Sequence, residues 1–258
     1  MPIDFTAIVE AFKAAVPFIP VTLRLAFIPL FIGMIFGLLI ALARFFQVPV
    51  LSKFLAGLIT IGKGVPVVLS LMVAYLLFSD LFDQVATSLS LPIRFSDINR
   101  EYIGIFVLSF TATISLSEIF RGALSAIPKD QWDAAASIGL TQFQTIARVI
   151  FPQMIPIALP MICSQLIVLI KASSLVSLVS VVDGLNGALI TATTSYTFLE
   201  SYIAAAVIYW ALSITVEQVS QLFERNYTRK FVKGSALWYK LKTSTKNLIK
   251  MKSLKGSI

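Results

Sequence analysis

Long apolar runs alternate with short polar segments along most of the chain. Five runs are long enough to cross a bilayer as helices, at 16–43, 54–79, 102–120, 152–170 and 202–222. A sixth run, 175–190, is shorter and contains Asp183 and Gly187, so we expect a re-entrant or external segment buried against protein. The pattern predicts an all-α polytopic membrane protein with about five transmembrane helices.

Composition agrees with a membrane location. The chain has 258 residues, of which 57% are hydrophobic and 13% charged, whereas about 25% of the residues in a soluble domain are charged. The first residues include Asp4, Glu10 and Lys13, which do not form the basic region of a cleavable signal peptide. We therefore expect the first apolar run to remain as a span.

The formal charge of +8 comes from the C-terminal tail. Ten lysines and arginines and no acids lie in 225–258, which leaves 11 basic and 13 acidic residues in 1–224. We therefore divide the chain into a membrane domain, 1–224, and a basic tail, 225–258. Leu237 and Trp238 are among the apolar residues between the tail lysines, a pattern typical of an interfacial helix on anionic lipid. A solvated tail is the alternative, and we expect no nucleic-acid partner.

Charge placement predicts the orientation, because lysine and arginine concentrate in cytoplasmic loops. Arg44 and Lys53 follow the first run, 80–101 is acid-rich, 121–148 carries three bases and two acids, and the C-terminus is strongly basic. These segments fit five spans with the N-terminus outside and the C-terminus inside. Arg24 and Lys171 would then lie near the outer boundary, where long side chains can snorkel.

The residue types exclude several kinds of catalytic site. The sequence has no histidine and one cysteine, Cys163, within an apolar run. Histidine-based metal sites and serine–histidine or cysteine–histidine nucleophiles are therefore impossible. No G-x-x-x-x-G-K-[S/T] phosphate loop occurs, so ATP chemistry would have to come from another subunit. We expect no catalytic residue, metal or cofactor in this chain.

The segment 127–152 lies between two spans and predicts two short helices. Pro128 suits a first helical turn, and the alanines at 134–136 favour a helix. Gly139 suits the left-handed residue that ends many helices. The first helix of a cytoplasmic hairpin is therefore expected to stop at Gly139.

The second helix of this hairpin has its own start signal. Thr141 and Gln144 have the spacing of a capping box, so a helix should begin immediately and run to about Phe151, before Pro152. Small alanine side chains allow another backbone to approach closely, which favours docking on a partner. An amphipathic surface hairpin without a partner is the alternative.

These residues resemble the EAA loop of ABC importer permeases, which reads E-A-A, three residues, G, nine residues, I-x-L-P. The corresponding residues here are Asp133, Ala134, Ala135, Gly139, Val149, Phe151 and Pro152. Aspartate replaces glutamate, valine replaces isoleucine and phenylalanine replaces leucine. In that family the loop is the coupling helix that fits a cleft of the ATP-binding subunit.

Further motifs resemble the polar amino-acid uptake permeases of this family. They are Thr22-Leu23-Arg24-Leu25, Lys63-Gly64-Val65-Pro66, Ser117-Glu118-Ile119-Phe120-Arg121-Gly122 and Leu169-Ile170-Lys171-Ala172-Ser173-Ser174-Leu175. Their order and their places relative to the predicted spans match the family pattern over about 16–224. The basic tail lies outside it.

The resemblance implies a permease subunit of a bacterial cell-membrane importer. Its expected partners are two ATP-binding subunits, which hold ATP and Mg, a second identical or homologous permease, and an external solute-binding protein. The expected substrate is a polar amino acid, with cystine, glutamine and other neutral or acidic amino acids open.

Five residues are candidates for the substrate path. Gly64 and Pro66 would break or kink the second span and free backbone groups to face a cavity, and Lys63 is either a path residue or a snorkelling anchor. Ser164 and Gln165 are polar residues within an apolar run, and the resemblance implies that Gln165 can contact substrate. A neutral amide there argues against a carrier dedicated to cationic amino acids. Hydrogen bonding between helices is the alternative role.

Other polar residues keep different roles open. Glu118 and Arg121 are three residues apart and can pair on one helix face, as a structural pair or a gate. A stand-alone secondary transporter or channel should show internal repeats with paired broken helices and membrane-centre carboxylates; we find no convincing repeat, and only Glu118 and Asp183 keep this alternative open. An intramembrane enzyme would need Lys171 to activate a neighbouring serine, a poor geometry on a helix.

Overall fold

The computed structural model describes residues 3–223, so the basic tail predicted at 225–258 and the boundary at 224 lie outside the described residues. Within residues 3–223 the chain is helical and has no strand. Its helices are α1 (Phe5–Ala15), α2 (Ile19–Phe45), α3 (Leu51–Gly64), α4 (Val67–Ser88), α5 (Glu101–Ser125), α6 (Lys129–Ser137), α7 (Gln142–Thr145), α8 (Phe151–Ser173), α9 (Gly184–Ser195) and a last helix, Phe198–Phe223.

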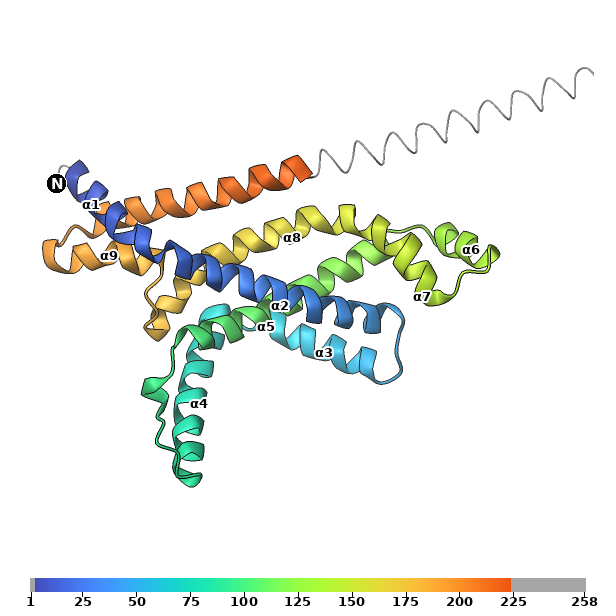
Figure 1. Ribbon diagram of the computed structural model, residues 1–258, viewed down its shortest axis with the longest axis horizontal. Coiled ribbons are helices and arrows are strands. Elements are labelled where there is room, and N and C mark those ends of the chain that lie inside the picture. Colours follow the sequence, from blue (N-terminus) through green and yellow to red (C-terminus); the bar gives the residue numbers. More distant parts are fainter. Residues whose placement is uncertain (1–2, 224–258) are drawn as a thin grey trace, which may run out of the picture.

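Five helical segments are long and apolar enough to cross a membrane, which confirms the predicted fold class. They are Phe5–Phe45, Val67–Ser88, Glu101–Ser125, Gln142–Val179 and Phe198–Phe223. Figure 1 shows α2, α5, α8 and the last helix running side by side along the long axis of the molecule, with α6 and α7 at one end. The protein is a multi-pass membrane protein.

The first span begins earlier than the predicted 16–43. Asp4 caps α1 by accepting a 2.8 Å hydrogen bond from the Thr6 backbone N–H, and α1 continues through a 3₁₀ turn at Val16–Phe18 into α2. Ala15 packs with Ala188 of α9 and with the last helix. The first helical segment therefore starts at α1, because α9 packs on α1 and helps to bury Ala11 and Ala15.

The core lies where α2 and α5 cross at very short distance. Gly33 and Gly37 face α5, and a Cβ placed on Gly33 would lie 2.8 Å from the Cβ of Ala112. A Cβ on Gly37 would lie 3.0 Å from the Ser117 backbone nitrogen. The spacing of two glycines four residues apart is a known membrane-helix packing motif, in which missing side chains let backbones approach.

Gly33→Ala is expected to lower stability by about 1–3 kcal/mol, because α2 must move away from Ala112 to admit a methyl group. The control is Gly57→Ala on α3, where an added Cβ meets nothing within 4 Å. Thermal unfolding of the detergent-purified variants measures the difference. Equal midpoints for the two variants would contradict the close packing of α2 on α5.

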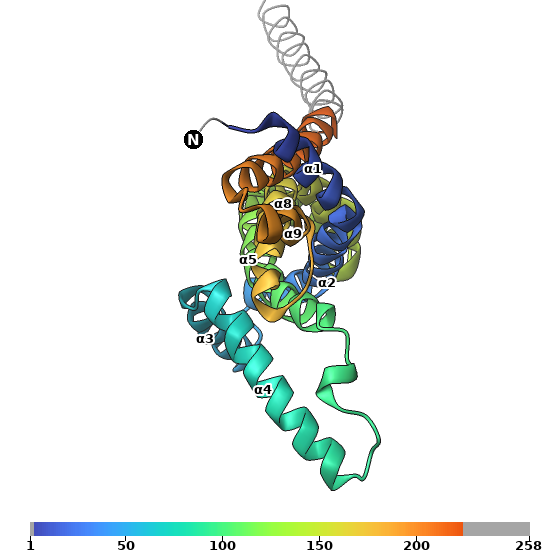
Figure 2. The same ribbon diagram turned by 90° about the vertical axis from the view of Figure 1, so that its left-hand side faces the viewer.

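The prediction of one span at 54–79 is wrong, although the predicted break within it is confirmed. The chain forms α3 and α4, separated at Val65 and Pro66. Proline lacks a backbone N–H and disfavours helical geometry in the preceding residue, and Val65 is extended with φ −93° and ψ 121°. Figure 2 looks along the bundle and shows α4 extending away from the other helices.

The helix expected to end near Phe151 instead continues as a membrane helix. The Thr141–Gln144 capping box forms as predicted and starts α7. A π-helical segment, Ile146–Ile150, then joins α7 to α8, in which Pro152 occupies the first turn. Proline is tolerated there because a residue in the first turn of a helix does not need to donate a backbone hydrogen bond within that helix. The preceding π turn already interrupts the regular hydrogen-bond pattern.

The interrupted run at 175–190 does not form one helix. It contains a 3₁₀ segment, Ser174–Val179, a left-handed Ser180 and the first half of α9. Gly184, Gly187, Ala188 and Ala192 of α9 are buried, which agrees with the prediction of a segment packed against protein.

Candidate functional site

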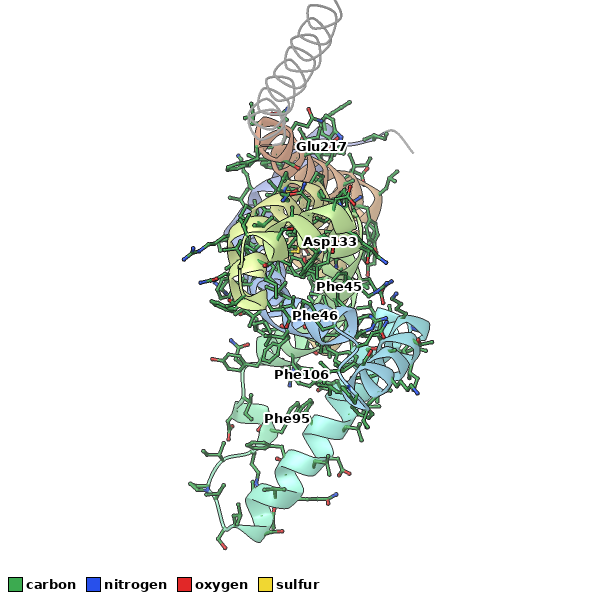
Figure 3. The ribbon with its side chains drawn as sticks, turned by 90° about the vertical axis from the view of Figure 1, so that its right-hand side faces the viewer. Phe45, Phe46, Phe95, Phe106, Asp133 and Glu217 are labelled. Atoms are coloured by element: carbon green, nitrogen blue, oxygen red, sulfur yellow. The ribbon has the colours of Figure 1, made fainter. Side chains whose placement is uncertain are left out.

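The turn that ends α6 has the geometry that its sequence predicts. Gly139 follows α6 with a positive φ of 78°, where residues with a Cβ are strained. The Leu140 N–H donates to the Ala135 carbonyl at 3.1 Å, which closes the end of α6. Figure 3 faces the end of the molecule that carries the α6–α7 hairpin and shows Asp133 above Phe45 and Phe46.

The outer surface of the hairpin combines small and large apolar side chains. Asp133 and Ala134 are exposed, whereas Ala135 is buried against the chain itself. Ile138 is 77% exposed and Phe143 is 79% exposed. Two large apolar side chains exposed at the tip of the hairpin are typical of a surface that another protein covers.

Aromatic stacking fastens α6 to the end of α2. The Trp132 ring stacks on Phe45 with centroids 5.7 Å apart, and its edge-to-face contact with Phe46 is 6.0 Å. The Gln153 amide of α8 donates to the Gln131 side chain at 3.1 Å. The hairpin is therefore in contact with both α2 and α8.

A cluster of four charged side chains lies at the same end as the hairpin. The pair predicted between Glu118 and Arg121 forms at 2.8 Å, and Arg44 of α2 also donates to Glu118 at 2.7 Å. Lys63 lies 3.4 Å from the same carboxylate, which is the counter-charge that its position requires. One carboxylate thus joins α2, α3 and α5.

The candidate path residues fall into two separate groups. Lys63 points to Glu118, while Gly64 and Pro66 mark the exposed break between α3 and α4. On α8, the exposed Ser164 donates to its own helix at the Pro160 carbonyl, 3.0 Å away. Gln165 is 8% exposed, and its Nε2 has no hydrogen-bond partner among residues 3–223.

Ser201 and Ser213 of the last helix also carry buried hydroxyls without a partner in the described part of the chain, as does Ser109 of α5. Ser109 lies eight residues after the start of α5, and Gln165 lies eight residues before the end of α8. Figure 1 shows the two helices side by side and in opposite directions. Buried polar groups are normally paired, so the unpaired atoms of Ser109 and Gln165 are suited to a polar ligand.

Asp183 belongs to a buried network at the opposite end of the bundle. Its Oδ1 accepts from the Asn186 N–H at 3.1 Å and caps α9, and Oδ2 accepts from the Tyr209 hydroxyl. The Gly184 N–H donates to the Thr22 Oγ1 at 3.0 Å. Burial raises the pKa of the Asp183 carboxyl, while the hydrogen bond from Tyr209 lowers it. These contacts give Asp183 a structural role.

Asp183→Asn is expected to retain at least about half of the wild-type uptake, because an amide oxygen still caps α9. Asp183→Ala removes the cap and strands the Tyr209 hydroxyl, so we expect a stability loss of about 1–3 kcal/mol. Uptake assays and thermal unfolding compare the two variants. If Asp183→Asn abolishes uptake in normally folded protein, the carboxylate charge itself is required, as in an ion-coupled transporter.

Arg24 does more than snorkel at the boundary. Its guanidinium makes two hydrogen bonds to Glu101, at 2.8 and 3.1 Å, although the Arg24 side chain is 51% exposed. The pair joins α2 to the first residue of α5.

The Ser173 and Ser174 hydroxyls donate to backbone carbonyls of Ile170 and Lys171, so neither is activated by the Lys171 amine.

Comparisons with known proteins match most of the chain. A family model for the binding-protein-dependent transport system inner membrane component matches residues 33–229. The "Probable amino-acid ABC transporter permease protein YckA" of Bacillus subtilis is 33% identical over 85% of this chain and 91% of its own length. The histidine/lysine/arginine/ornithine transport system permease protein HisQ of Salmonella typhimurium is 32% identical over 81% of this chain and 90% of its own.

A solved structure has the same fold. The crystal structure of an amino acid ABC transporter with histidines has a chain that is 27% identical, with a TM-score of 0.73 over 88% of this chain and 100% of its own. These comparisons agree with the resemblance found in the sequence motifs.

Proposed function

The chain belongs to the family of binding-protein-dependent transport system inner membrane components, and from this membership we propose that it lines the solute path of an ATP-driven amino-acid importer. The observation that carries the proposal is the α6–α7 hairpin, which presents Ile138 and Phe143 at one end of a five-span membrane fold. The chain is a non-catalytic permease subunit, and the remaining parts of the importer are proposed below.

The hairpin docks on an ATP-binding subunit. Asp133, Ala134 and Gly139 lie on its exposed surface, and Ala135 fixes α6 against the chain. The partner holds ATP and Mg, and two such subunits serve a pair of permeases. When they close, the Trp132 stack and the Gln131–Gln153 hydrogen bond transmit the movement of the hairpin to α2 and α8.

A second permease, identical or homologous, covers α4. Only Leu71 and Ala86 of this helix are buried within the described chain, and Figure 2 shows that α4 projects away from the bundle. A hydrophobic groove lies at the junction of α4 and α5. A span held so loosely by its own chain requires a neighbouring subunit to fix its orientation.

The solute path follows the unpaired polar atoms of α5 and α8. The Gln165 amide is a donor suited to the α-carboxylate of an amino acid, and Ser109 adds a second polar group. The break at Gly64 and Pro66 opens the path between α3 and α4, and the Glu118 cluster holds its inner end closed. The neutral amide of Gln165 suits a neutral or acidic amino acid better than a cationic one, for which a carboxylate would be expected in the site.

The hairpin end faces the cytoplasm, so the N-terminus and the α9 end face outward. A solute-binding protein delivers the amino acid to that outer end. This orientation agrees with the basic residues at the hairpin end and follows the rule for lysine and arginine in cytoplasmic loops.

Affinity purification of the tagged full-length protein from its native membranes, followed by mass spectrometry, tests the proposal. We expect an ATP-binding subunit to co-purify with wild type and to be lost with Phe143→Glu, because a carboxylate replaces a 79% exposed apolar contact. The matched control is Phe5→Glu, since Phe5 is 77% exposed at the other end. A homogeneous complex without any ATP-binding subunit would refute the proposal.

A further inference from the structure

An open pocket of about 420 Å³ lies beside the turn that joins α2 to α3. Its lining includes three cations, Arg44, Lys53 and Arg121, and no carboxylate among the described residues. The turn at 47–50 forms one wall, and the inner end of α5 forms another. The pocket belongs to neither the hairpin surface nor the path residues on α8.

The positive charge around this pocket exceeds what Glu118 can neutralise. Arg44, Lys63 and Arg121 share that one carboxylate, and Lys53 has no acidic side chain within 4 Å in the described chain. The Arg44 side chain is only 14% exposed, so part of this charge is held away from bulk water. Such a surplus attracts an anion more strongly than an exposed pair of lysines does.

An apolar surface extends from the pocket along α3. Leu51, Phe54, Leu58 and Ile61 are 40–70% exposed and follow one another at helical spacing. The ten residue steps from Leu51 to Ile61 rise about 15 Å, which is half the ~30 Å thickness of the hydrocarbon core. Figure 1 shows α3 running back beside α2 from the turn that borders the pocket.

We propose that the pocket binds the phosphate of an anionic phospholipid, whose acyl chains lie along the apolar stripe of α3. Three cations at the level of the span ends would hold the phosphate, and the stripe below them would match one leaflet of hydrocarbon. A free phosphate ion would use the cations but not the stripe. Lipid binding here depends only on the fold around the α2–α3 turn, whatever solute is transported.

Native mass spectrometry of the purified full-length protein tests this site with phosphatidylglycerol and with phosphatidylcholine of the same acyl chains. Lys53→Gln removes a cation that makes no ion pair in the described residues, so the fold should persist. We expect this variant to bind phosphatidylglycerol about fivefold more weakly, the effect of one cation near a membrane surface. Lys53→Arg should restore binding.

The matched control is Lys129→Gln, which removes an exposed cation at the same end but outside the pocket lining. It should leave phosphatidylglycerol binding unchanged. Equal binding of the two lipids by wild type, or equal losses in Lys53→Gln and Lys129→Gln, would overturn the proposal. Displacement of phosphatidylglycerol by inorganic phosphate at equal concentration would also overturn it, since the stripe would then contribute nothing.

Discussion

Replacing Gly139 by arginine is expected to reduce ATP-dependent uptake at least ~tenfold while leaving the protein inserted in the membrane at its normal level. An added Cβ at Gly139 meets nothing within 4 Å, so the chain itself has room for the new side chain. The positive φ of 78° adds a strain of about 1–2 kcal/mol, which the whole bundle tolerates. The main effect is a long cation on the surface that we propose docks on an ATP-binding subunit.

Gly139→Asn separates docking from backbone strain. Asparagine adopts the left-handed conformation more readily than other residues with a Cβ, and its side chain is short. We expect this variant to retain uptake within about threefold of wild type. Equal losses in both variants would assign the effect to the backbone, and normal uptake by Gly139→Arg would contradict the docking surface. Initial rates of labelled amino-acid uptake measure all three proteins.

Glu118→Gln is expected to lower stability by about 2–4 kcal/mol, because it leaves Arg44, Lys63 and Arg121 together without a counter-charge. The Glu118 side chain is 22% exposed, so solvent screens part of the repulsion. For a chain of this size the change corresponds to a fall of about 5–10 °C in the unfolding midpoint. Thermal unfolding in detergent measures it.

The double variant Glu118→Gln/Arg121→Gln provides the control. Removing one of the three cations lowers their mutual repulsion, so the double variant should be more stable than Glu118→Gln alone. A double variant less stable than the single one would show that the cluster is not held by charge. An unchanged midpoint in Glu118→Gln would show that the carboxylate does not join α2, α3 and α5.

Local signals in the sequence predicted the features that depend on local structure. Run length predicted five spans but misplaced the second, and Gly139 with the Thr141–Gln144 box predicted where the first hairpin helix ends and the second begins. The pairing of Glu118 with Arg121 follows from helical spacing within α5. Pro66 predicted the break in the second apolar run. In each case the deciding residues lie within a few positions of one another.

Contacts between distant segments were not predicted. Arg44 and Glu118 are 74 positions apart and meet only because α2 crosses α5 closely at Gly33 and Gly37. That glycine pair was the one available signal for the crossing. The stacking of Trp132 on Phe45 depends on the same placement of α2. The direction of α4 could not be predicted from its sequence, because only Leu71 and Ala86 of this helix are buried against the described chain.

Uptake of labelled amino acids into liposomes tests the central claim most directly. One set contains this chain with its co-purified ATP-binding subunits, enclosed ATP and external solute-binding protein, and another contains this chain alone with an ion gradient. We predict uptake only in the first set, and loss of that uptake when ATP is omitted. Uptake of equal rate by the chain alone, driven by the gradient, would contradict its assignment as a permease subunit.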